Sequence, residues 1–410
     1  MLRPRKRAAG LIAGALLLFV VGTSVQAGWL LVLASCLLGA AVSGLLFPGR
    51  MVRGIEVERR APSEAFQGEE IRVDLVVANR SRAVRLALDL RDDHLEPVRA
   101  FVGRLSPGER VVVETTRIAM RRGVHEVSDV VVASAAPFGV AERRRRLEVP
   151  SATIVYPRLV ALEGLSFLES APTPERALHA DPRRGGGPDY LGIREYRTGD
   201  SMRHINWPST ARHGELMVRE FEREQTRRLA VVLDAIDDGP VEGAPTPLDV
   251  ACSIAASVAF AAHGAGQGVR LVSSAVGEAV SLSRADPAAM LRWLAELRPG
   301  GGLSLAALAA ELGDEVLGAE TVLLVAPTWR SNAAAELADA VADVVGRAPR
   351  VVVALVQVGA FEGIGPVPHL AEAEVDDLIR ALEARGALVL PTGRGDDLVR
   401  ALAGRAGARA

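Results

Sequence analysis

Residues 189–222 contain a dense group of side chains that could take part in catalysis or binding. The stretch reads DYLGIREYRTGDSMRHINWPSTARHGELMVREFE, and it holds Tyr, Trp, two histidines and both signs of charge in a chain otherwise rich in Ala, Val, Leu, Gly and Arg. His204, His213 and Asp200 could ligate a metal, but their spacing matches no standard ligand pattern and no Cys lies among them. We interpret the two histidines as surface residues of a polar loop.

The charges of this stretch are nearly balanced. Between residues 189 and 228 there are eight Arg and seven Asp or Glu, and the whole chain has a net charge of -2. Because phosphate binding needs an excess of basic side chains, we expect no nucleic-acid partner. Balanced charge beside aromatic residues suits either an internally paired connector or a protein-docking surface. Both hypotheses stay open for Arg194, Glu195, Tyr196, Arg197, Asp200, Trp207, Arg212 and Glu220.

Other chemistry-bearing residues favour structural interpretations. The two cysteines, Cys36 and Cys252, form no CxxC pair, so we expect neither a disulfide framework nor a thiolate metal site. Cys252 with His263 could act as a nucleophile pair, but a small core thiol and a histidine at a helix end explain them better. The glycine run at 185–187 lacks a following GK[ST], so we interpret it as a flexible connector and predict no nucleotide site. The sequence thus predicts no catalytic residues.

The N-terminal residues predict a membrane hairpin. No charged residue lies between Arg7 and Arg50, and small and polar residues at 21–28 interrupt this apolar stretch. We expect two helices, about 8–22 and 27–46, that contact membrane lipid through residues 8–47. The first is short for a full span, but a signal peptide would not explain the second. Basic residues flank both ends, which predicts that both soluble domains are cytoplasmic.

The remaining chain divides by its pattern into a β-rich and an α/β part. Within 51–160, alternating runs at 71–81, 84–92, 109–120 and 125–135 predict strands of an immunoglobulin- or fibronectin-like sandwich without a cysteine pair. Residues 161–228 form the connector and the stretch described above. From 229 to 410, buried strands alternate with helices, which predicts a mostly parallel sheet covered on both faces. Thr246, Pro247 and Asp249 indicate the start of one helix, and 268–284 reads as a strand hairpin.

Several motifs together resemble a known bacterial family, the domain of unknown function 58. They are GIREYR at 192–197, GD at 199–200, INW at 205–207, AR at 211–212, EL at 215–216, REFE at 219–222, and upstream RRGVHEVSDVVVASAAPFGV at 121–140 and IVYPR at 154–158. The resemblance implies a membrane protein whose C-terminal part, residues 229–410, is a von Willebrand factor A-like domain. It also implies a genetic association with MoxR-type AAA+ ATPases and with other membrane or von Willebrand A proteins.

Such domains often bind Mg²⁺ through a DxSxS loop and a later Asp. Here the corresponding loop has Asp234, Ile236 and Asp238, and the later strand ends in Ala326 and Pro327. Ile236 offers no oxygen ligand, so we expect no cofactor and no metal in the usual manner, with Asp234 acting as a cap or ion-pair partner. We therefore expect a non-enzymatic, membrane-anchored assembly or adaptor protein. The alternative is a Mg²⁺-dependent adhesion protein, or an enzyme that uses Asp234.

Overall fold

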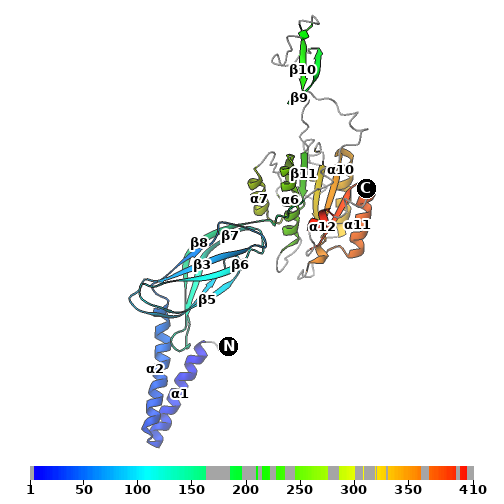
Figure 1. The fold of residues 1–410 in the computed structure, drawn as a ribbon. Coiled ribbons are helices and arrows are strands. Elements are labelled where there is room, and N and C mark those ends of the chain that lie inside the picture. Colours follow the sequence, from blue (N-terminus) through cyan, green and yellow to red (C-terminus); the bar gives the residue numbers. More distant parts are fainter. Residues whose placement is uncertain are drawn as a thin grey trace. The chain divides into compact units, whose positions relative to one another are not determined.

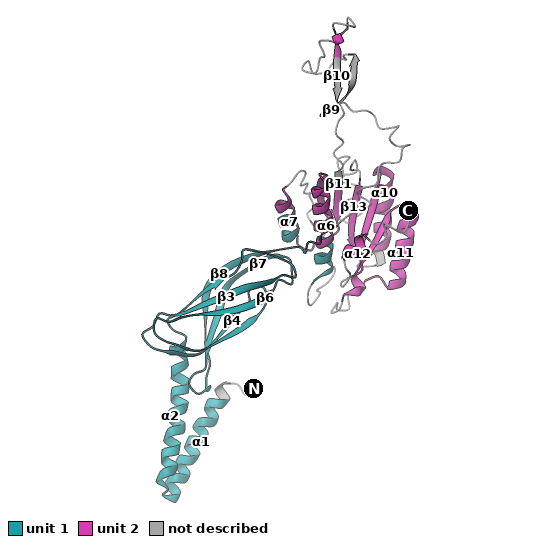
Figure 2. Cartoon of the chain, in the orientation of Figure 1, with its two compact units in different colours: residues 1–159, 242–252, 291–297 teal, residues 160–241, 253–290, 298–410 magenta. Residues whose placement is uncertain are grey.

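The structure is a computed structural model of the 410-residue chain. It describes residues 4–162, 185–195, 209–210, 215–221, 228–235, 245–275, 286–300, 308, 319, 321–328, 331–361, 369–393 and 398–403. The chain divides into two compact units (Figure 2). The first comprises residues 1–159, 242–252 and 291–297, and the second comprises residues 160–241, 253–290 and 298–410.

The first unit begins with a helical hairpin, α1 (Pro4–Val25) and α2 (Gly28–Met51) (Figure 1). Both helices are longer than the sequence predicts. Thr23 and Ser24, which suggested a break, donate their hydroxyls to the Phe19 and Val20 carbonyls at 3.1 and 2.8 Å, so the helix itself satisfies them. A Cβ added at Gly22 would lie 2.9 Å from the Leu30 Cβ, so glycine allows the two helices to approach closely.

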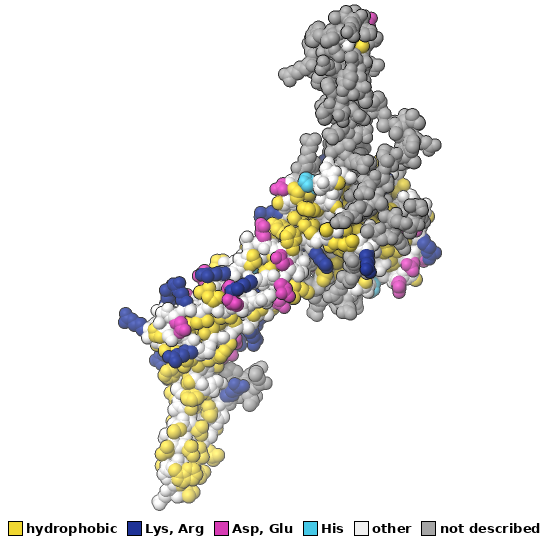
Figure 3. Space-filling model, in the orientation of Figure 1, with side chains coloured by type: hydrophobic (Ala, Val, Ile, Leu, Met, Phe, Trp, Pro, Cys, Tyr) yellow, Lys and Arg dark blue, Asp and Glu magenta, His cyan; other side chains and the backbone are white. Residues whose placement is uncertain are grey.

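The surface of this hairpin is apolar. Figure 3 shows hydrophobic side chains gathered over α1 and α2, and Leu16, Leu17 and Val32 are among those exposed. Residues 7–25 and 28–51 are long and apolar enough to cross a membrane, so the hairpin could anchor the chain there. A third helix, α6 (Pro247–Gly264), meets the same criterion, but 78% of its apolar window is buried inside the protein. Its apolar surface is therefore already covered by protein.

Two β-sheets follow in the first unit. One has the order β1-β3-β6 and the other β2-β8-β7-β4-β5. The strands are β1 (Ile55–Arg60), β2 (Glu64–Phe66), β3 (Glu70–Asn79), β4 (Arg85–Asp92), β5 (Val98–Leu105), β6 (Arg110–Ile118), β7 (Gly123–Ser134) and β8 (Arg143–Tyr156). Alternate residues of both sheets, among them Leu75, Val77, Leu88, Leu90 and Val130, share one core. The four expected strands correspond to β3, β4, β6 and β7.

A buried charge network joins the two sheets. Asp92 on β4 accepts hydrogen bonds from Arg59 on β1 at 2.6 and 3.1 Å, and from Arg117 on β6 at 2.8 Å. All three side chains are 0% exposed. Burial alone would raise the pKa of Asp92, but the two guanidinium groups outweigh burial and hold that pKa below its usual value. Arg59 Nη1 also donates to the Val149 carbonyl, and Arg117 Nη1 donates to the His94 carbonyl, each at 2.5 Å.

His94 lies beside this network and is neutral. Its Nε2 is 3.0 Å from the Thr153 Oγ1, whose own hydrogen goes to the Pro62 carbonyl at 2.7 Å. Nε2 must therefore carry the proton and donate it to Thr153, which leaves Nδ1 as a buried acceptor without a hydrogen-bond partner in the described residues. Burial, followed by the charge of Arg59, lowers the pKa of His94 to about 4.

This buried histidine predicts acid sensitivity. In the unfolded chain a histidine binds its proton near pH 6.5, whereas His94 in the folded chain does so only near pH 4, so the unfolded state binds more protons between these values. The free energy of unfolding should therefore fall by up to about 3 kcal/mol as the pH drops through this window. Urea unfolding of the chain in detergent should show a flatter pH profile for His94→Gln. The exposed control His263→Gln should keep the wild-type profile, and equal slopes in all three proteins would contradict the prediction.

The second unit contains a parallel sheet with the order β12-β11-β13-β14-β15. Its strands are β11 (Arg228–Leu233), β12 (Gly268–Ser273), β13 (Thr321–Pro327), β14 (Val351–Val356) and β15 (Leu388–Thr392). This is a doubly wound order, in which the chain moves outward from β11 in one direction and then in the other. The predicted parallel sheet is confirmed. β12 pairs with β11 in parallel, and the second strand of the expected hairpin lies outside the described residues.

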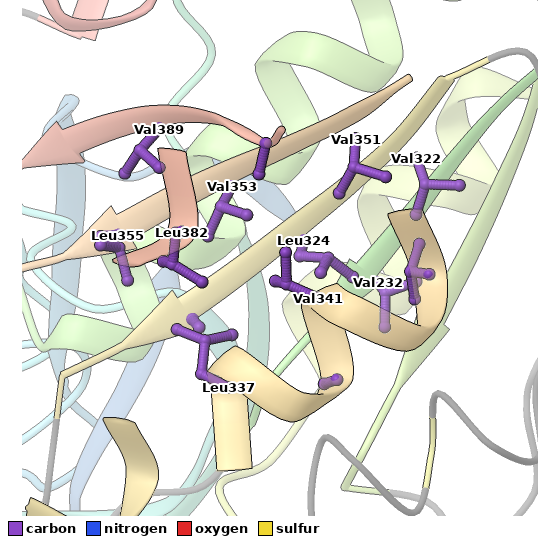
Figure 4. Packing of buried hydrophobic residues seen from close by; sticks show 14 of the residues in the cluster. Val232, Val322, Leu324, Leu337, Val341, Val351, Val353, Leu355, Leu382 and Val389 are labelled. Carbon is purple, nitrogen blue, oxygen red and sulfur yellow. The ribbon is translucent and has the colours of Figure 1, made fainter. Parts of the chain in front are cut away.

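Helices cover both faces of this sheet, as the sequence predicts. The elements are α6, α7 (Pro287–Glu296), α10 (Ser331–Arg347), the short η2 (Val358–Ala360), α11 (Glu372–Ala384) and α12 (Leu398–Ala403). Figure 4 shows Leu337 and Val341 of α10 and Leu382 of α11 packed on Leu324 and Val353 of the sheet. Residues of the opposite face are also buried, and α6 lies on that side (Figure 1).

The predicted start of α6 is confirmed in detail. The Thr246 N–H donates to the Asp249 Oδ2 at 2.9 Å, and the Asp249 N–H donates to the Thr246 Oγ1 at 3.1 Å. This reciprocal pair satisfies two backbone donors at the helix start.

Candidate functional site

The two ends of the motif-rich stretch form a pair of strands. β9 (Gly185–Glu195) is antiparallel to β10 (Met217–Phe221), with Glu195 opposite Met217 and Arg194 opposite Val218. Glu220 lies opposite Gly192, and a register shift follows it. The glycine run at 185–187, which we interpreted as a flexible connector, begins β9, and Gly185 pairs with Phe221 after that shift.

The structure describes only three of the eight residues for which we left both a connector and a docking surface open. Arg194 and Glu195 on β9 and Glu220 on β10 are brought into the same two-stranded sheet, although Glu220 follows Arg194 by 26 residues in the sequence. The other residues of the hypothesis lie outside the described residues: Tyr196, Arg197, Asp200, Trp207 and Arg212. His204 and His213 lie outside them as well. The two hypotheses for this stretch, a structural connector and a docking surface, both stay predictions.

Asp234 lies at the carboxyl end of β11, beside the point where the strand order reverses. In doubly wound sheets this edge is where ligands bind. The Asp234 N–H donates to the Val325 carbonyl at 2.9 Å, and Asp234 Oδ1 accepts the Ser274 hydroxyl at 3.0 Å. Ser274 Oγ in turn accepts the Ala235 N–H at 2.9 Å. Asp234 thus ties the ends of β11, β12 and β13 together. Its expected role as a helix cap or an ion-pair partner stays a prediction.

The neighbouring strand end offers a hydroxyl rather than a second carboxylate. β13 ends with Ala326 and Pro327, and Thr328 follows. The Thr328 Oγ1 accepts the Val358 N–H at 3.1 Å, so it too is engaged with the adjacent loop. Ile236 and Asp238 lie outside the described residues. Among the residues that the structure describes, no group of three His, Cys, Asp or Glu is arranged to hold a metal ion.

Cys252 lies in the core, as the sequence predicts. Cys252 is fully buried, and burial raises the pKa of its thiol to about 11, so the thiolate that a nucleophile needs does not form near neutral pH. His263 is exposed in the last turn of α6, about 16 Å further along the same helix at 1.5 Å per residue. Cys36 is exposed on α2. The interpretation of Cys252 and His263 as structural residues is consistent with this geometry.

Sequence reasoning missed the role of Arg122. Its side chain, almost fully buried, lies in the turn between β6 and β7 of the first unit. Nη1 donates to the Leu297 carbonyl at 2.8 Å, and Nε lies 3.3 Å from the Asp249 Oδ1, within ion-pair range but outside hydrogen-bond geometry. Arg122 therefore reaches both the first turn of α6 and the residue after α7. The signal was the motif RRGVH at 121–125, which carried the family resemblance without a physical explanation.

The arrangement defines a class of protein: an apolar helical hairpin, a β-rich part and a doubly wound α/β part. Residues 192–326 match the family described as "Protein of unknown function DUF58". The matched segment runs from β9 to the end of β13, so it includes Asp234, Ser274 and α6. The family predicted from the sequence motifs is confirmed.

Other comparisons add little. None of the curated proteins matches the chain. The CARDB domain of the PF1109 protein from Pyrococcus furiosus is 12% identical over 23% of this chain and 86% of that chain, with a TM-score of 0.17. A β-glucosidase from Listeria innocua is 20% identical over 24% of this chain and 16% of its own, with a TM-score of 0.14. The Pseudomonas fluorescens alkylpurine DNA glycosylase AlkC is 13% identical over 31% and 42%, with a TM-score of 0.16. Scores of this size carry no argument about function.

The contacts of Arg122 predict a large stability effect. Arg122→Met keeps the apolar stem but removes the charge, which leaves the buried Asp249 carboxylate without its guanidinium and the Leu297 carbonyl without that donor. Breaking a buried pair in this way should lower the free energy of unfolding by about 3 kcal/mol. The neighbouring Arg121 is exposed, so Arg121→Met should cost much less. Thermal and urea unfolding of both variants measure the difference, and equal losses would contradict this role.

Proposed function

We propose that this protein is a non-enzymatic, membrane-anchored assembly or adaptor protein that works through protein–protein interaction with a MoxR-type AAA+ ATPase. The observation that carries the anchoring is the hairpin of α1 and α2, whose exposed surface is apolar over two helices of membrane-spanning length. The basic residues that flank it, Arg7 before and Arg50 and Arg53 after, support a cytoplasmic location for both soluble parts.

The polar groups at the ligand edge of the parallel sheet support an adaptor rather than an enzyme. Asp234 is bonded to Ser274, and Thr328 receives the Val358 N–H. These groups brace the strand ends, and the described Cys252 is a buried, protonated thiol. In this proposal the β-rich part is an immunoglobulin- or fibronectin-like sandwich and the α/β part is a von Willebrand factor A-like domain. The doubly wound sheet and the shared sandwich core support these finer assignments.

The proposed partner follows from the family resemblance. Genes of the family commonly lie beside genes of MoxR-type ATPases. The sequence of this chain reveals no nucleotide-binding motif of its own. The ATPase would supply the energy, and the anchored protein would hold it at the membrane. The docking surface would be the stretch between β9 and β10, where Arg197 and Trp207 combine a guanidinium with a large aromatic ring.

Co-purification tests this proposal. From membranes in mild detergent, the wild-type chain should retain an AAA+ ATPase that mass spectrometry identifies. Trp207→Ala and Arg197→Ala should abolish that retention and leave the melting temperature nearly unchanged. Arg91→Ala is a control, since Arg91 is exposed on β4 and pairs only on the surface with Asp93. If every variant of the stretch loses stability and binding in proportion, the stretch is a structural strap and the docking role fails.

A second candidate function rests on Asp234 and Ser274, which place a carboxylate and a hydroxyl together at the ligand edge. They could belong to the Mg²⁺ site of an adhesion-type protein, or serve an enzyme that uses Asp234. We expect millimolar Mg²⁺ to leave the melting temperature unchanged, because Ile236 stands where an oxygen ligand is needed. A rise of several degrees that Asp234→Ala removes and the exposed control Asp286→Ala retains would favour the metal-binding function instead.

A further inference from the structure

The loop between β7 and β8, residues 135–142, carries the end of a motif that the proposed function leaves unused, PFGV at 137–140. We propose that this loop is a second membrane contact, in which Phe138 inserts into the headgroup boundary of an anionic bilayer. The inference rests on the proposed membrane anchoring and adds a contact from the β-rich part of the same unit.

Two contacts fix the loop against the hairpin within the first unit. Val140 is buried and packs on α2 so closely that a Cβ added at Gly44 would lie 2.6 Å from its Cγ2. Arg7, at the start of the apolar window of α1, donates to the Gly139 carbonyl at 3.4 Å. The loop therefore touches both helices of the hairpin, at the end where their basic flanks lie.

The length of α2 gives the depth of this contact. From Gly28, the first residue of α2, to Arg50 the helix rises about 33 Å, which matches a hydrocarbon layer of about 30 Å with Arg50 just outside it. Gly44 lies about 24 Å from Gly28, and so about 9 Å to the membrane side of Arg50. In a hydrocarbon layer of about 30 Å, a loop that packs on Gly44 thus lies about 6 Å from the edge, close to the boundary with the headgroups.

The loop has the chemistry of such a boundary. Phe138 is 58% exposed although it is large and apolar. Two backbone donors near it are satisfied, since the Gly139 N–H donates to the Ala135 carbonyl at 2.8 Å and the Ala136 N–H donates to the Ser134 Oγ at 3.3 Å. Each paired donor lowers the cost of approaching the hydrocarbon, and a Phe side chain can bury its ring at the boundary between headgroups and acyl chains.

The charges around the loop identify the lipid. Arg7 and Arg50 lie on the hairpin, and Arg143 begins β8 three residues after Val140. All three are exposed, and a bilayer with anionic headgroups presents the complementary charge at the level where the helices leave it. The occupant of this face is therefore the phospholipid surface that the hairpin itself crosses.

Nitroxide depth measurements on the full chain test the inference. In a Cys36→Ala background, single cysteines replace Phe138, Leu38 and Val124, while the buried Cys252 stays unlabelled. Leu38 is an exposed residue near the middle of α2, and Val124 is an exposed residue at the other end of β7, about 33 Å from Ser134. The chain is placed in vesicles of phosphatidylcholine with a minor fraction of phosphatidylglycerol. Collision rates with oxygen, which enters lipid, and with a nickel chelate, which stays in water, are compared.

The oxygen-to-nickel ratio should be highest at position 38, several-fold lower but lipid-like at 138, and aqueous at 124. If 138 matches 124 while 38 is in lipid, the loop inference fails and the anchoring stands. If 38 is aqueous as well, the anchoring and the inference both fail. In pure phosphatidylcholine the label at 138 should move toward water. Arg143→Gln should weaken this lipid dependence, whereas Arg99→Gln, exposed on β5, should not. If the label at 138 has the same depth with and without phosphatidylglycerol, the proposed preference for anionic lipid is wrong.

Discussion

The carboxylate of Asp92, shared by Arg59 and Arg117, is the interaction on which the geometry of the first unit depends. It joins β1 and β6 of one sheet to β4 of the other in the absence of any disulfide. Arg59 is on the strand that directly follows α2, and Arg117 lies five residues before Arg122. The same buried network therefore fixes the point where the chain leaves the hairpin and the turn that carries Arg122. Two cations and one anion, fully buried, are stable only because carbonyl oxygens accept the remaining donors.

The second unit has a different packing requirement. Five parallel strands of nearly continuous apolar residues need cover on both faces, and α6, α10 and α11 supply it. The polar groups are left at the strand ends, where Asp234 and Ser274 bond to each other and hold the ends of β11 and β12 together. The edge that binds ligands in many sheets of this order is thus partly closed by the protein's own side chains.

Local patterns made much of this architecture predictable, and their limits have physical causes. The hairpin, the alternation in β3, β4, β6 and β7, and the Thr246 cap all depend on neighbours in sequence. The helix ends were placed too early because a hydroxyl can bond to its own helix, as Thr23 and Ser24 do. β8 was not predicted as a strand because it begins with four arginines, which show no alternation of polar and apolar residues. All four are exposed because of their place on the sheet. The glycine run was not predicted to be part of a strand because its pairing partner, Phe221, is distant in sequence.

From the sequence alone we could predict the family, the order of hairpin, β-rich and α/β parts, the parallel sheet and the burial of Cys252. Each of these follows from residue type and short spacing. The folded chain alone shows that Arg59, Asp92 and Arg117 form one network, that Arg122 reaches Asp249 and Leu297, and that Val140 packs on Gly44. These contacts join residues far apart in the chain, and an arginine in this composition looks the same whether it is solvated or buried. Burial and partners, which give each charge its energy, exist only once the strands have paired.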